Sequence, residues 1–122
     1  MPDQMNAYAK GVMGETAALE YLLQTGMQEI ARRYRSPYGE IDLIMLDDQT
    51  LVFVEVKARE HGTFQSAQLA VTPKKQHRLI QTARCFLGDH PHYAFSPMRF
   101  DIVTVTREGI SHIANAFEGR EW

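Results

Sequence analysis

The sequence predicts an α/β fold in which a central mixed β-sheet is flanked by helices, and three observations indicate it. Two stretches have the hydrophobic spacing of amphipathic helices, and five shorter ones have the composition of β-strands. They follow one another in the order helix, three strands, helix, two strands, which favours a mixed sheet over a sandwich or bundle. The chain has 122 residues, of which 44% are hydrophobic. That is the size of one core, so residues 1–122 are expected to form a single domain.

The first helix is expected over residues 6–25, where apolar side chains recur at helical spacing. Gly26 would stop this helix, because glycine is the residue most often found just past a helix C-terminus. Residues 27–35 alternate weakly between apolar and polar side chains, and the Ser-Pro-Tyr-Gly sequence at 36–39 is a strong turn signal. A first strand at or near a sheet edge follows from this pattern.

Residues 40–46 and 51–57 are dense in β-formers, and the polar residues 47–50 between them are typical of a hairpin turn. Two last strands are expected over residues 98–105 and 110–116, around the turn at 107–109. Strands two and three therefore form a β-hairpin, and the last two strands form another.

Between the two pairs of strands, residues 60–71 follow neither period and contain a glycine, which indicates an exposed loop beside the end of strand three. Thr72 is then expected to cap a second helix, with Pro73 at the first helical position and Gly88 as the stop. The apolar stripe of this helix would consist of Gln76, Leu79, Ile80, Ala83, Phe86 and Leu87.

The charge and the termini limit the function classes. A formal charge of −2 and a pI near 6.2 argue against a strong nonspecific nucleic-acid binder, although basic residues cluster at 32–35, 57–59 and 74–78 and could form one positive face. No apolar run approaches the roughly 20 residues of a membrane span, and no signal peptide is evident. A cytoplasmic protein is expected. Its only cysteine, Cys85, excludes an internal disulfide and is read as a structural thiol.

The hairpin of strands two and three carries the candidate chemistry. If its turn is centred within residues 47–50, Ile44 faces Phe53 and, two positions further, Asp42 faces Glu55. Directly opposed residues in an antiparallel pair have β-carbons about 5 Å apart, and like charges there are destabilising. A divalent cation between the two carboxylates would resolve the repulsion, since hard oxygen ligands suit magnesium or manganese. Without metal, one carboxyl of the pair should have a raised pKa.

This interpretation depends on the register and has an alternative. An odd-length turn would place Asp42 opposite a valine instead of Glu55. In the predicted register Glu40 faces Lys57, so Asp42 and Glu55 could also lie at solvated strand ends while Lys57 only neutralises Glu40. A short Glu-x-Lys tripeptide is common by chance, so the hairpin pattern needs support from elsewhere.

The first helix supplies some support. Glu15 falls on the apolar stripe that should pack against the sheet, and a carboxylate aimed inward is costly unless it is paired or serves a metal. Gly14 beside it would permit close approach of helix and sheet. A hydrogen bond from Tyr8 to a partly buried Glu15 remains the alternative.

Three stretches together resemble a known family: Gly-Glu at 14–15, Gly-Glu-Ile-Asp-Leu at 39–43, and Val-Glu-Val-Lys at 54–57. They resemble the D-(x)n-E-x-K signature of the restriction-endonuclease-like superfamily. The whole chain, including Arg-Phe-Asp at 99–101, resembles the YraN-type family of small bacterial proteins assigned to that superfamily, and its layout is similar to that of archaeal Holliday-junction resolvases.

The resemblance implies roles for four residues. Asp42 and Glu55 would be metal ligands for Mg²⁺ or Mn²⁺, Lys57 the site lysine, and Glu15 the helix acid of the resolvase-like branch. The implied activity is metal-dependent endonuclease cleavage of phosphodiester bonds in DNA, branched or damaged DNA included. Because the same fold also hosts inactive members, a noncatalytic nucleic-acid-binding or partner-binding domain is the alternative.

Four basic residues are candidate nucleic-acid contacts: Arg35, Arg59, Lys75 and Arg78. For those at the start of the second helix, a solvated basic face is the ordinary alternative. DNA is the favoured substrate, and RNA is a further alternative that the sequence does not exclude, since no aromatic stacking motif is evident. A homodimer would suit symmetric substrates, as in junction-cleaving relatives, although no interface stands out in the sequence. Asp101 could be a third acid or could pair with Arg99.

Overall fold

The computed structural model describes the backbone of residues 7–59 and 71–118, with side chains from residue 13 onward in the first stretch. Its elements are α1 (Ala7–Gln24), β1 (Gln28–Ser36), β2 (Gly39–Asp47), β3 (Thr50–Ala58), α3 (Pro73–Asp89), the short 3-10 helix η2 (Pro91–Tyr93), β4 (Met98–Thr106) and β5 (Gly109–Phe117). The predicted order of two helices and five strands is confirmed, and each predicted boundary lies close to the observed one.

The strands form one five-stranded mixed sheet in the order β1-β2-β3-β4-β5. Every neighbouring pair is antiparallel except β3 and β4, which run parallel. A parallel pair needs a crossover connection, and α3 lies in the chain between these two strands. The restriction-endonuclease-like arrangement expected from the sequence, a central mixed sheet flanked by helices, is therefore present.

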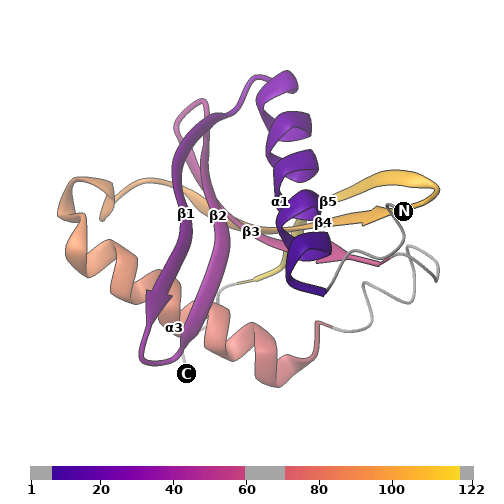
Figure 1. Ribbon diagram of the computed structural model, residues 1–122. Helices are drawn as coiled ribbons and strands as arrows, with labels where there is room; N and C mark the ends of the chain where they lie inside the picture. The colour runs from indigo at the N-terminus through magenta and orange to yellow at the C-terminus, as the bar shows by residue number, and fades with distance from the viewer. Residues whose placement is uncertain (1–6, 60–70, 119–122) are drawn as a thin grey trace.

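The two long helices cover opposite faces of the sheet (Figure 1). The core under α3 contains Ile41, Ile44, Leu51, Phe53, Val71, Leu79, Ile80, Ala83, Phe86, Phe100 and Ile102. The core under α1 contains Ala18, Leu19, Leu22, Met27, Leu43, Met45, Val52, Val54 and Val103. Residues alternate between these lists along β3 because successive side chains of a strand point to opposite faces. Neither of these described helices is long and apolar enough to cross a membrane.

The helix ends match the sequence in one case and differ in the other. After α1, Gly26 adopts φ +101°, and the N–H of Met27 donates to the Leu22 carbonyl at 3.2 Å, a glycine-dependent helix end. Gly88 was predicted to stop α3 and does not. The helix continues to Asp89, and the N–H of His90 donates to the carbonyl of Phe86 at 2.9 Å.

The start of α3 is as predicted, because the Thr72 side chain accepts a hydrogen bond from the Lys75 N–H and Pro73 is the first helical residue. The predicted exposed loop at 60–71 falls mostly outside the described residues. Its last residue, Val71, is described and contradicts the prediction, since its side chain is buried against the core under α3.

Both edge strands of the sheet are irregular. The pairing of β1 with β2 shifts register between Glu29 and Ala31, and that of β4 with β5 shifts between Phe100 and Ile102. Each edge strand also contains a non-glycine residue with a left-handed backbone, Arg33 in β1 (φ +50°) and Asn115 in β5 (φ +52°). Each edge ladder is thus interrupted by one register shift.

Gly14 brings α1 against the end of β3, as the sequence predicts. A Cβ atom built at Gly14 would lie 2.5 Å from the Cβ of Ala58, closer than two such atoms can approach. Glycine is therefore required for this helix to lie where it does. The close contact positions the neighbouring Glu15 near the ends of the strands that carry the candidate site.

Candidate active site

The hairpin of β2 and β3 has the register that the sequence predicts. Ile44 pairs with Phe53, and the last bridged pair toward the open end of the hairpin is Leu43 with Val54. One position further in this register Asp42 stands opposite Glu55, but the two strands form no backbone bridge there. The candidate acids therefore lie where the regular ladder of this pair stops.

At that position a side chain of β2, that of Asp42, bonds to the backbone of β3. Its Oδ2 accepts a hydrogen bond from the N–H of Val56 at 2.8 Å, so the carboxylate is held against β3. Burial and the charges of Glu55, Glu15 and Glu40 together raise the pKa of Asp42 to about 7, against the opposing effect of the Val56 N–H. The raised pKa of one acid that the sequence analysis expected is thus found at Asp42.

Glu55 is buried and contacts two lysines. The Nζ of Lys75 lies 3.2 Å and the Nζ of Lys57 lies 3.8 Å from its Oε1. Burial lowers the pKa of Lys57 to about 8, aided by the neighbouring ammonium of Lys75 and opposed by Glu55. Burial also disfavours the charge of Lys75, but its contacts with Lys57 and Glu55 outweigh burial and raise its pKa. Two strand residues and one helix residue thus form a compact charged cluster.

Glu15 is close to this cluster but is held by another partner. Arg33 donates from Nε to the Glu15 Oε1 at 3.1 Å. Glu15 was predicted to reach toward Asp42 and Glu55, and its charge is near enough to help raise the Asp42 pKa. The alternative partner, the side chain of Tyr8, lies outside the described residues.

Arg33 is the site neighbour that sequence reasoning missed. It lies on β1 beside Asp42, and β1 and β2 are bridged on either side of this position but not at it. The left-handed backbone of Arg33 accompanies the interruption. No hydrophobic pattern marks such a residue in advance, because the conformation depends on the neighbouring strand and helix.

The suggested pairing of Glu40 with Lys57 is wrong. Glu40 faces Arg35 across β1 and β2, with 3.9 Å between the Arg35 Nε and the Glu40 Oε2. Lys57 faces Glu55 instead. The interpretation in which Lys57 serves only to neutralise Glu40 is therefore excluded by the geometry.

The predicted nucleic-acid contacts are not gathered in one place. Lys75 and Arg78 both line a groove of about 360 Å³ between the start of α3 and the turn after β1. Arg35 is exposed on β1, where it faces Glu40. Arg59 is exposed at the end of β3, and its N–H donates to the Val105 carbonyl at 2.9 Å.

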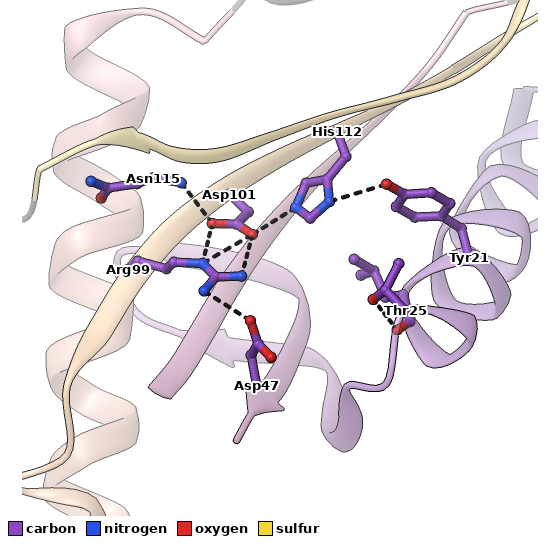
Figure 2. Close-up of polar contacts among 8 residues, drawn as sticks. Tyr21, Thr25, Asp47, Arg99, Asp101, His112 and Asn115 are labelled. Carbon is purple, nitrogen blue, oxygen red and sulfur yellow. Dashed lines mark hydrogen bonds and ion pairs between the residues drawn. The ribbon is translucent and has the colours of Figure 1, made fainter. Parts of the chain in front are cut away.

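Asp101 is part of a separate network on the face of the sheet covered by α1 (Figure 2). It accepts hydrogen bonds from Arg99 Nε at 3.0 Å and from the Asn115 N–H at 2.9 Å, and His112 Nε2 lies 2.7 Å from its Oδ2. Tyr21 of α1 approaches the other nitrogen of His112 at 3.4 Å. Burial alone would raise the pKa of Asp101, but these contacts hold it below its ordinary value. Asp101 pairs with Arg99, as one of the two alternatives predicted, and ties β5 to β4.

The acidic residues near Asp42 could supply only part of the coordination shell of a magnesium ion. No group of three or more His, Cys, Asp or Glu side chains within residues 13–59 and 71–118 is arranged to bind a metal ion. Magnesium is nevertheless often bound through only one or two carboxylates, with water and phosphate oxygens completing its shell. Asp42 and Glu55 fit this second pattern, and burial together with carboxylate repulsion favours a cation beside Asp42.

Comparison with known proteins gives one consistent family. The model of an uncharacterised protein family, UPF0102, matches residues 14–105. A UPF0102 protein of Rhodopseudomonas palustris (strain BisB18) is 40% identical over 118 residues, which cover 96% of this chain and 86% of the relative. One of Pseudomonas putida (strain GB-1) is 44% identical over 115 residues, covering 88% and 92%. The chain therefore belongs to UPF0102, the YraN-type family that its Gly-Glu, Gly-Glu-Ile-Asp and Glu-Val-Lys motifs predicted.

Proposed function

We propose that this protein is a Mg²⁺- or Mn²⁺-dependent endonuclease that hydrolyses phosphodiester bonds in DNA. One observation carries the proposal: two facing acids on adjacent strands, Asp42 and Glu55, lie with Lys57 and Lys75 at the point where the β2–β3 ladder ends. Ion pairing between Lys75 and Glu55 alone would not require a second acid with a raised pKa beside it. Such an acid is better explained by a cation that the site is built to accept.

Asp42 and Glu55 would hold the ion. When bound, a magnesium ion supplies charge that polarises a phosphodiester oxygen and lowers the pKa of a coordinated water. Asp42 is oriented for this by the Val56 N–H, which fixes one carboxylate oxygen on a rigid strand. Glu55 is fixed on the neighbouring strand, where its side chain is 8% exposed.

Lys57 would act beside the acids. Its side chain is 10% exposed and its pKa is lowered to about 8, so a fraction of this amine is unprotonated near neutral pH. An amine at Nζ of Lys57 can orient a water and accept its proton, whereas an ammonium there stabilises negative charge on phosphate oxygens. Lys75 lies on α3 and its ammonium is partly exposed. It would leave Glu55 and bind a phosphate oxygen instead.

A noncatalytic nucleic-acid-binding or partner-binding domain is the competing function. It is favoured by the two lysines beside Glu55, because they can neutralise this carboxylate without a metal ion. Metal dependence separates the two functions. A binding domain would hold nucleic acid equally well with EDTA and leave it intact.

The test is incubation of the protein with linear, flapped, gapped and four-way DNA and with RNA, in Mg²⁺, Mn²⁺ or EDTA. We expect metal-dependent cleavage of at least one DNA, which Asp42→Asn and Lys57→Ala abolish. Asp48→Asn, in the exposed turn between β2 and β3, is the matched control and should cleave normally. Intact DNA across the whole panel, or equal cleavage by Asp42→Asn, would reject the proposed activity.

A further inference from the structure

A groove lies directly beside the acid pair, between the turn that joins β1 to β2 and the first turns of α3. Its volume is about 360 Å³. Lys75 belongs both to the groove and to the cluster around Glu55, so the groove adjoins the candidate site. Figure 1 shows the turn between β1 and β2 alongside α3.

The walls of the groove are held together before any ligand arrives. Ser36, at the end of β1, and Thr82, in the middle of α3, share a hydrogen bond of 2.9 Å between their hydroxyl oxygens. The turn then packs on the helix at Gly39, where an added Cβ would be 3.8 Å from the Cβ of Arg78. The turn and the helix therefore form one fixed cleft, and binding would need little rearrangement.

The groove is predominantly basic. Lys74, Lys75 and Arg78 line it, and its one carboxylate, Glu40, faces Arg35. Among the described residues no carboxylate pairs with Lys74 or Arg78, although Lys75 pairs with Glu55. Exposed cations that pair with no described carboxylate attract anionic groups, and a phosphate diester is the anion that the neighbouring site would handle.

Tyr38 completes the groove with an aromatic ring. It lies in the turn, lines the groove, and is 53% exposed. An exposed ring beside cations is suited to stacking on a nucleobase. Such stacking contributes a similar binding free energy for every base. Inside a duplex the faces of the bases are covered by their neighbours, so only an unpaired base can stack in this way.

We propose that the groove binds one unpaired nucleotide of the DNA strand that leaves the acid pair. Tyr38 stacks on its base, while Arg78 and Lys74 hold its phosphate. The volume suits a single nucleotide, since pockets for small ligands begin at roughly 300 Å³ and a duplex needs a far wider surface. This inference rests on the proposed nuclease function. It narrows the substrate to DNA with unpaired nucleotides, such as flaps, gaps or single strands.

The test measures binding in EDTA, by fluorescence anisotropy with a 12-nucleotide single strand, a flapped duplex and a blunt duplex. The single strand and the flap should bind more tightly than the blunt duplex. Tyr38→Ala should weaken their binding roughly tenfold without changing the salt dependence, and Tyr38→Phe should bind like the wild type. Phe95→Ala removes another exposed aromatic side chain outside the groove and should have no effect.

The phosphate contact is tested separately, by the salt dependence of binding. Arg78→Gln should reduce the slope of log affinity against log salt by about 0.7, the value for one phosphate contact with a single strand. Arg84→Gln, which alters an exposed arginine of the same helix outside the groove, is the control. Wild-type binding by Tyr38→Ala, or equal affinity for the blunt duplex, would overturn the inference. Binding in EDTA requires neither metal nor cleavage, so a missing activity and a missing groove give different results.

Discussion

Asp42 is subject to two opposing effects. The hydrogen bond from the Val56 N–H favours its ionised form, whereas burial and the nearby charge of Glu55 favour its neutral form. The second effect dominates, since the pKa is raised from 3.8 to about 7. Between these two values the folded protein binds a proton at Asp42 that the unfolded chain has lost. Folding stability must therefore depend on pH in this range.

The sign of that dependence gives the first prediction. The contribution of protonated Asp42 is fully present below pH 3.8 and is lost as pH rises to about 7, by at most about 4 kcal/mol. Asp42→Asn should remove this decline, because an amide oxygen still accepts the Val56 N–H but carries no charge. In EDTA at pH 8 its free energy of unfolding should equal or exceed that of the wild type. Denaturant unfolding from pH 4 to pH 8 measures both.

Asp42→Ala is the matched comparison, since it removes the acceptor as well as the charge. It should be less stable than Asp42→Asn by about 1 kcal/mol, the usual net contribution of one hydrogen bond. If Asp42→Asn is strongly destabilised in EDTA, then Asp42 is a structural residue and the metal site is wrong.

Lys75 gives a second prediction at the same scale. Its ammonium neutralises the Glu55 Oε1 and would compete with a metal ion for that oxygen. In Lys75→Gln the increase in melting temperature caused by Mg²⁺ should be larger than in the wild type. The metal-free protein should lose no more than about 1 kcal/mol, because the ammonium is partly exposed. Lys74→Gln, which alters the preceding exposed lysine, should show the wild-type response, and equal responses in both variants would exclude the competition.

At the scale of the elements, the contact of α1 with β3 gives a third prediction. Gly14→Ala places a methyl group against Ala58 and should destabilise the fold by about 1–3 kcal/mol, the usual range for an overpacked contact. Ala58→Gly removes the opposing methyl, so the double variant should recover most of the loss caused by Gly14→Ala. A double-mutant cycle of unfolding free energies measures the coupling. Additive effects would mean that α1 can shift without cost.

The elements were predictable to the extent that local patterns determine them. The β2–β3 register followed from the polar turn and the alternation of the strands, and it placed Asp42 opposite Glu55. The end of α3 did not follow, because the helix continues through Gly88 and its last N–H bond comes from His90. The partner of Glu15 also could not be read from the sequence. It depends on Arg33, whose backbone turns left-handed where a distant helix meets the first strand.

At the scale of the whole molecule, the candidate site joins elements that are distant in the chain. Asp42 and Glu55 come from two strands, Lys75 from the helix on one face and Glu15 from the helix on the other. Such a site exists only in the folded chain. A ligand that binds it must therefore stabilise the fold as a unit.

This gives the fourth prediction. The melting temperature of the wild type should rise with Mg²⁺ or Mn²⁺ concentration. At a metal concentration a hundred times the dissociation constant, the free energy of unfolding should increase by about 2.7 kcal/mol. Glu55→Gln should reduce the rise, whereas Lys57→Ala should keep most of it. Differential scanning fluorimetry with and without metal measures this. Ca²⁺-free, Mg²⁺-free samples in EDTA are the baseline, and an unchanged melting temperature at millimolar metal would contradict the proposed site.

The two irregular edges of the sheet bear on how copies of this protein could assemble. A straight edge strand exposes a row of unpaired N–H and C=O groups to which a second sheet can add. Here Arg33 on one edge strand and Asn115 on the other adopt left-handed backbones, each edge carries a register shift, and the Asn115 N–H is already bonded to Asp101. Joining two sheets into one continuous sheet is therefore disfavoured at both margins. A symmetric pair of these proteins would therefore be expected to meet through helices or loops and not through a shared sheet edge.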